Sequence, residues 1–103
     1  MSWQSATREE VLARVAAEMA ELDPEYFAGL EAYLVEPYSV VVNRFDEHDQ
    51  VFVVARSTSH VIFFEDIEGN FCLARESNGR LSEVMDFVDL GLNLREMRRM
   101  EGL

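Results

Sequence analysis

The most charged short segment of the chain is Asp46-Glu47-His48-Asp49. A histidine among carboxylates has the composition of a metal site or of a general base. Adjacent residues in a tight turn point in divergent directions, however, so these four side chains cannot easily converge on one ion. We therefore expect a solvated turn, and the functional alternative is an acidic contact patch formed by Asp46, Glu47 and Asp49.

A second acidic segment alternates Asp66, Glu68 and Asn70, as the first ligand positions of a calcium loop do. An EF-hand also requires a glycine at its sixth position and a bidentate Glu at its twelfth, and this segment has a phenylalanine and a serine there. We expect a plain hairpin instead. Its tip, with Glu65, Asp66 and Glu68, is the second candidate surface for binding a partner.

Nucleophilic side chains are present but are not arranged as a catalytic site. Ser57-Thr58-Ser59 precedes His60, yet a nucleophile needs an oriented base and an oxyanion site, and the glycine pattern of a nucleophile elbow is absent. We expect a polar turn here, and we expect Cys72 to be a small packed side chain. The sequence therefore predicts a non-enzyme with no catalytic residue, no metal site and no cofactor.

The charge of the chain indicates the kind of partner it could bind. Twenty acidic against nine basic residues give a net charge of −11. Such a charge repels phosphate backbones and anionic lipids, which excludes nucleic acid and membrane surfaces as partners, and it attracts basic proteins. The first fifty residues hold eleven of the acids and three Arg, so the acidity is concentrated there.

Length, cysteine content and hydropathy indicate one domain over residues 1–103 in the cytoplasm. A chain of 103 residues is the size of a single domain that folds without crosslinks. One cysteine excludes an internal disulfide and fits a reducing compartment. The longest apolar runs, such as residues 51–55, are too short for a signal sequence or a membrane span.

Two helices are predicted before the first strand. Thr7 and Glu10 have the spacing of a capping box, and the apolar residues that follow fall on one helical face. Asp23 and Pro24 then predict a second helix, with Asp23 as N-cap and Pro24 at the first helical position, that Pro37 closes. A last helix is predicted after residue 93, with Asn93 as its cap.

Between these helices the apolar period changes to two. Alternating β-branched and aromatic residues predict strands at 38–45, 51–56, 60–66 and 71–76. Their short polar connections favour an antiparallel meander. Asn78-Gly79 predicts a tight turn into a fifth strand near 81–87, although a short helix there is left open. The predicted fold class is α+β, with two N-terminal helices, a four- to five-stranded antiparallel meander sheet and a C-terminal helix.

The strand region resembles the small immunity proteins that bacteria encode beside polymorphic or contact-dependent toxins. The resemblance is carried by short strands with acidic turns, namely VFVVAR at 51–56, VIFFED at 61–66, FCLAR at 71–75 and NGRL at 78–81. It implies a protein without catalytic residues that binds its cognate toxin and blocks the active site. Many such toxins are basic nucleases, for which an acidic inhibitor mimics phosphate charge.

Two functional hypotheses follow for an acidic domain of this kind. The first is an immunity-type inhibitor, a monomer or weak dimer, that binds a basic cognate toxin through its carboxylates. The second is an acidic chaperone or adaptor for a secreted effector protein. Two helices ahead of a sheet fit the usual order of elements in secretion chaperones poorly, which favours the inhibitor.

Overall fold

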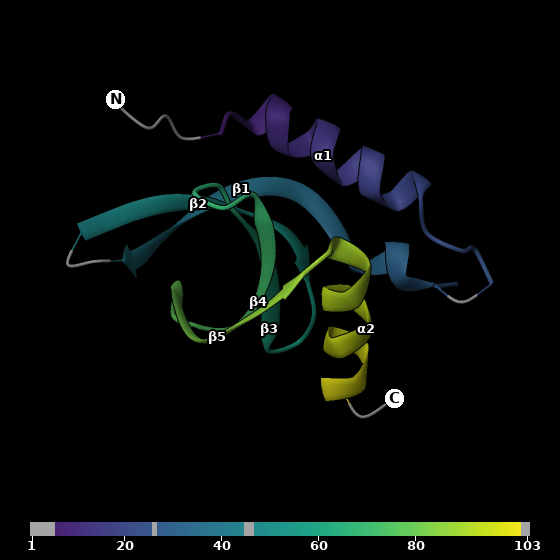
Figure 1. The fold of residues 1–103 in the computed structure, drawn as a ribbon. Helices are drawn as coiled ribbons and strands as arrows, with labels where there is room; N and C mark the ends of the chain where they lie inside the picture. The colour runs from purple at the N-terminus through teal and green to yellow at the C-terminus, as the bar shows by residue number, and fades with distance from the viewer. Residues whose placement is uncertain (1–5, 26, 45–46, 102–103) are drawn as a thin grey trace.

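The computed structural model describes residues 6–25, 27–44 and 47–101, with only the backbone described at 42–44 and 47–49. The described chain forms an α+β fold in which two helices flank a five-stranded antiparallel sheet (Figure 1). The elements in chain order are α1 (Arg8–Ala20), the 3₁₀ helix η1 (Leu30–Tyr33), β1 (Leu34–Arg44), β2 (Glu47–Arg56), β3 (His60–Glu65), β4 (Asn70–Ser77), β5 (Arg80–Val88) and α2 (Leu90–Met100).

The first helix begins as its sequence predicts. The hydroxyl of Thr7 accepts a hydrogen bond from the Glu10 backbone N–H at 3.1 Å, and the Glu10 carboxylate accepts one from the Thr7 N–H at 3.1 Å. This reciprocal capping box satisfies two backbone donors that the first turn leaves without partners. Val11 is fully buried on the inner face of the helix, so α1 lies against the sheet through a narrow apolar edge.

The predicted second helix is wrong in extent and type. The Asp23 carboxylate accepts from the Glu25 N–H at 2.9 Å, but this contact forms a turn that does not continue as an α-helix. Gly29 has a left-handed backbone with φ of 84°, which interrupts helical geometry and leaves only the short helix η1 after it. From Leu34 the chain pairs with β2, opposite Ala55, so sheet formation overrides the local helical preference of residues 34–36.

The five strands form a meander in the order β1-β2-β3-β4-β5, which confirms the predicted antiparallel sheet. The first hairpin is longer than predicted, because residues 47–50 extend β2 and pair with residues 41–44. The predicted solvated turn at 46–49 is therefore wrong for residues 47–49, which lie in β2, and residue 46 lies outside the described chain.

The fifth segment is a strand, which settles the alternative left open for residues 81–87. Asn78 and Gly79 have φ values of 55° and 77°, and two consecutive positive values are typical of the tight turns that join hairpin strands. The pairing of β5 with β4 shifts register twice, between Phe71 and Cys72 and again between Leu73 and Arg75. These bulges twist the strand and interrupt the hydrogen-bond ladder at the end nearest α2.

Both faces of the central strands are buried. One face packs against the helices, and its buried residues are Val11, Leu30, Val54, Ala55, Ile62, Phe64, Phe71, Leu73, Leu90, Leu94 and Met97. The opposite face forms a second cluster of Val51, Val53, Val61, Phe63, Cys72 and Ala74. Cys72 is thus a small packed side chain, as expected.

The sheet is strongly curved, as the ribbon in Figure 1 shows. Tyr38 of β1 packs against this cluster, and its hydroxyl donates to the Glu76 carboxylate of β4 at 3.4 Å. Burial, reinforced by the Glu76 charge, raises the pKa of Tyr38. An edge strand therefore reaches across the curved sheet to a strand with which it does not pair.

The last helix begins earlier than predicted. Its first residue is Leu90 and its N-cap is Asp89, although the Asp89 side chain makes no capping hydrogen bond. Asn93 lies within the first turn and is fully buried, so its predicted role as N-cap is wrong. The reason is tertiary, because the chain turns directly from β5 into α2 and the helix starts where β5 ends.

Candidate functional site

The first acidic segment extends a strand and does not form a turn. Glu47 and Asp49 lie in β2, with their backbones opposite Arg44 and Val42. Asp46 lies outside the described residues. Glu47 and Asp49 thus belong to a strand, and contact of the three predicted residues with a partner stays a prediction.

Two of the three predicted carboxylates at the β3–β4 hairpin make internal hydrogen bonds. Glu65 accepts from the backbone N–H groups of Ile67 at 2.7 Å and Glu68 at 2.9 Å, which stabilises the turn. Asp66 accepts from the Ala6 N–H at 3.1 Å and so ties the hairpin to the start of α1. Glu68 is exposed at the tip. We infer that Glu65 and Asp66 have a structural role in addition to any role in binding.

The segment with serines before His60 is a polar turn, as predicted. The Ser59 hydroxyl lies 2.9 Å from Nδ1 of its neighbour His60, and the Thr58 hydroxyl donates to the Glu101 carboxylate at 2.5 Å. Hydrogen bonds from the hydroxyls of Ser57 and Thr58 lower the pKa of Glu101. The turn therefore holds the end of α2 against the β2–β3 connection.

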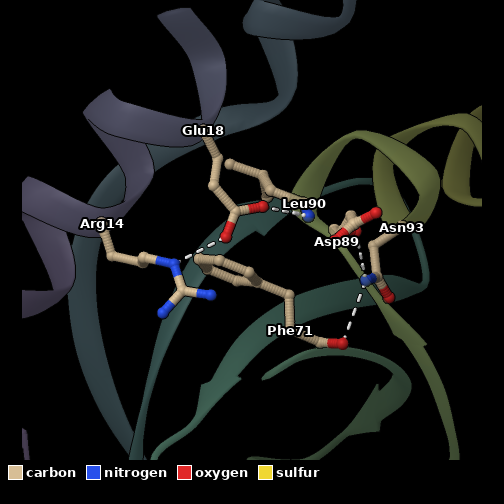
Figure 2. Close-up of polar contacts among 6 residues, drawn as sticks. All are labelled: Arg14, Glu18, Phe71, Asp89, Leu90 and Asn93. Atoms are coloured by element: carbon tan, nitrogen blue, oxygen red, sulfur yellow. Dashed lines mark hydrogen bonds and ion pairs between the residues drawn. The ribbon is translucent and has the colours of Figure 1, made fainter. Parts of the chain in front are cut away.

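A polar network joins α1 to the start of α2 (Figure 2). Glu18 accepts from the Leu90 backbone N–H at 2.8 Å and from Nε of Arg14 at 2.7 Å. The Leu90 N–H has no partner within its own helix because it belongs to the first turn, and the side chain of Asp89 does not cap it. Glu18 therefore caps α2 from another helix, where its negative charge also favours the positive end of the helix dipole.

Arg14 is held in place on two sides. Its guanidinium pairs with Glu18, and its central carbon lies 5.8 Å from the ring centre of Phe64 and 6.0 Å from that of Phe71. These distances fit a cation–π contact with both rings. The charge of Arg14 is thus already partnered within the protein.

Asn93 joins the same turn of α2 to the sheet, as Figure 2 shows. Its side-chain amide donates to the Phe71 carbonyl at 3.0 Å and to the Asp89 carbonyl at 2.8 Å. Phe71 lies where the β4–β5 pairing shifts register, so the amide gives its carbonyl a donor at this irregular position. Asn93 is 0% exposed.

A hollow of about 400 Å³ opens beside this network, between the end of α1 and the start of α2. It is lined by Arg14, Ala17, Glu18, Glu21, Leu22, Asp89 and Gly91. Gly91 permits the close approach of the two segments, because a Cβ at this position would lie 2.6 Å from Cδ2 of Leu22. Leu22 packed on Gly91 therefore forms the apolar floor of the hollow.

A second hollow of about 390 Å³ is also lined by Leu22. Its lining is mostly apolar and consists of Met19, Leu22, Asp23, Pro24, Phe27, Ala28, Gly29 and Glu31. The two hollows share Leu22, and we call them together the acid-rimmed groove. Arg98 of α2 supports this wall by donating to the Ala28 carbonyl at 2.7 Å.

The lining of the acid-rimmed groove includes carboxylates that are not engaged in contacts within the described chain. Among the residues that the structure describes, its lining contains five carboxylates and one guanidinium. The carboxylate of Glu18 already accepts two hydrogen bonds, from Arg14 and from the Leu90 N–H. The carboxylates of Glu21, Glu31 and Asp89 make no hydrogen bond or ion pair within the described chain. The groove thus combines apolar lining residues with carboxylates that can accept hydrogen bonds from a ligand.

Sequence reasoning did not find this groove. The i,i+4 spacing of Arg14 and Glu18 is a visible signal for an ion pair, but nothing local indicates that Glu18 also reaches a backbone 72 residues away. Glu21, Glu31 and Asp89 were counted only as part of the general acidity. Their gathering depends on the packing of three separate segments.

Two properties limit the chemistry of the described residues. Over residues 6–25, 27–44 and 47–101, no group of three or more His, Cys, Asp or Glu side chains could hold a metal ion. Nor does any described helix have the length and apolar character needed to cross a membrane. No protein-family model, curated protein or solved structure matches the chain.

Proposed function

We propose that this protein binds a basic partner protein and acts as an immunity-type inhibitor of a cognate toxin. The observation that carries the proposal is the gathering around one groove of Glu21, Glu31 and Asp89, whose carboxylates make no hydrogen bond or ion pair with the residues that the structure describes. A net charge of −11 would draw a positively charged surface toward it. A basic nuclease is the class of toxin best matched, because its active site already binds negative charge.

Inhibition of this kind requires no chemistry from the inhibitor. Long-range charge accelerates the encounter, and a few well-packed side chains at the centre of the interface supply most of the affinity. The apolar floor around Leu22 and Phe27 offers such a centre, with the carboxylates at its rim. Covering the toxin's substrate site would then suffice to neutralise it.

The test is co-expression with the product of the neighbouring open reading frame. We expect that product to be toxic alone and harmless together with this protein. Association measured at low and high salt should show an on-rate that falls as salt rises, because exposed charges are screened. A neighbouring product that is harmless alone, or toxicity unchanged by co-expression, would contradict the proposal.

A further inference from the structure

We propose that the acid-rimmed groove receives a basic segment of the partner, with an Arg or Lys side chain between Glu21 and Asp89 and an apolar side chain over Leu22. This inference rests on the proposed function, which it extends by naming the surface and the chemistry of the segment bound there. It is drawn from the contacts of the groove and from its charge.

The carboxylates of the first hollow match a basic side chain of the partner, in addition to the attraction from the net negative charge of the chain. Glu21 and Asp89 line the first hollow, and neither carboxylate has a partner within the described part of the chain, whereas the nearby Arg14 is already paired with Glu18 and lies over the rings of Phe64 and Phe71. Arg14 therefore contributes little neutralisation to the two free carboxylates. An incoming guanidinium or ammonium group would supply the donors that they lack.

The second hollow is suited to an apolar side chain of the same segment. Met19, Leu22, Pro24 and Phe27 line it, and each is partly or fully accessible at the surface. Covering them would remove apolar surface from water, which is favourable in proportion to the area buried. Because the two hollows share Leu22 as a lining residue, one extended segment with an apolar and a basic side chain can occupy both.

The second hollow also has acidic groups at its edge. Glu31 lies there, and its carboxylate makes no hydrogen bond or ion pair with the residues described, so a second basic residue of the same segment would be accommodated. The groove therefore selects for a segment that alternates apolar and basic residues. It discriminates against acidic segments, because unpaired like charges would be brought together.

The experiment uses a short synthetic peptide that alternates Leu and Arg, and a second peptide in which citrulline replaces every Arg. Each is titrated into the ¹⁵N-labelled full chain and followed by amide chemical shifts. We expect the Arg peptide to shift amides around Leu22 and Gly91, and the uncharged citrulline peptide to bind more weakly. Shifts centred on the β3–β4 hairpin, or no shifts at all, would overturn the proposal.

Two double variants that remove the same charge distinguish a contact within the groove from the effect of the net charge of the chain. The double variant Glu21→Gln/Asp89→Asn should weaken binding of the Arg peptide about tenfold, as expected for two ion pairs of modest strength. The control Glu9→Gln/Glu68→Gln removes the same charge, one carboxylate again from a helix start, and lies outside the groove lining. It should change the affinity less than about twofold. Equal losses in the two variants would overturn the proposal, as would free arginine ethyl ester binding as tightly as the peptide.

The outcome is distinguishable from failure of the proposed function. If co-expression neutralises the toxin and Glu21→Gln/Asp89→Asn neutralises it equally well, the groove assignment is wrong and the inhibitor role stands. If the neighbouring product is harmless while the Arg peptide binds in the groove, the inhibitor role is wrong and the groove assignment stands.

Discussion

Replacing Glu18 by alanine is the sharpest test of how the two helices are joined. The substitution removes the acceptor for the Leu90 N–H and the ion-pair partner of Arg14. The side chain of Glu18 is 16% exposed, so the hydrogen bond to Leu90 is largely shielded from water. The variant leaves the first backbone donor of α2 without its cap.

The expected loss of stability can be worked from these contacts. A hydrogen bond to a charged group contributes roughly 1.5–3 kcal/mol, and removal of a helix cap costs about 1 kcal/mol by a separate measure. The side chain of Arg14 is 46% exposed, so its ion pair with Glu18 adds only about 0.3–0.5 kcal/mol. The higher helix propensity of alanine offsets about 0.3 kcal/mol of this loss in the free energy of unfolding. The net expectation is a loss of about 2 kcal/mol, or about 10 °C in Tm for a domain of this size.

The assay is thermal and urea unfolding followed by circular dichroism, with hydrogen exchange of the Leu90 amide as a local readout. Glu21→Ala is the matched control, because Glu21 lies on the same segment and its carboxylate has no partner among residues 6–25, 27–41 and 50–101. It should change stability by less than about 0.5 kcal/mol. Glu18→Gln keeps an acceptor without the charge and should lose less than Glu18→Ala. If Glu18→Ala and Glu21→Ala have the same Tm and the same urea midpoint, Glu18 does not cap α2. The same conclusion follows if the hydrogen exchange rate of the Leu90 amide is unchanged in Glu18→Ala.

Three further outcomes follow from other contacts. Asn93→Ala should cost about 2 kcal/mol, because the buried Phe71 carbonyl loses its donor, and urea midpoints equal to those of the native chain would refute this. Gly91→Val should cost about 1–3 kcal/mol by forcing Leu22 away, and an unchanged Tm would show that the helices separate freely. Since folding lowers the pKa of Glu101, its contribution should be full above the ordinary value of 4.5 and should disappear as pH falls through the lowered folded value. Glu101→Gln should therefore be less stable than the native chain near neutral pH and equal to it in strong acid, and a difference that persists there would contradict the assignment.

The strands and the first helix follow from local signals. The capping box at Thr7, the period-two alternation and the Asn78-Gly79 turn each act within a few residues, and each is present in the structure. The sheet order also follows, because short connections can join only neighbouring antiparallel strands. The fold class was therefore readable before any coordinate was known.

The second predicted helix failed because a longer-range interaction competed with a local one. Asp23 and Pro24 have the composition of a helix start, but Gly29 breaks the geometry and the segment from Leu34 gains strand hydrogen bonds with β2. Helix propensity is a weak preference that such pairing overrides. The same reason extends β2 back to Glu47.

What the amino-acid sequence determined by itself was the class of the fold, the strand order and an excess of acid in the first fifty residues. What the tertiary structure decided was which acids are used and which remain available. Glu18 caps a helix 72 residues away, whereas Glu21 and Asp89 are left facing the same hollow. Sequence spacing carries no record of such contacts, because they depend on how α1 and α2 pack over the sheet.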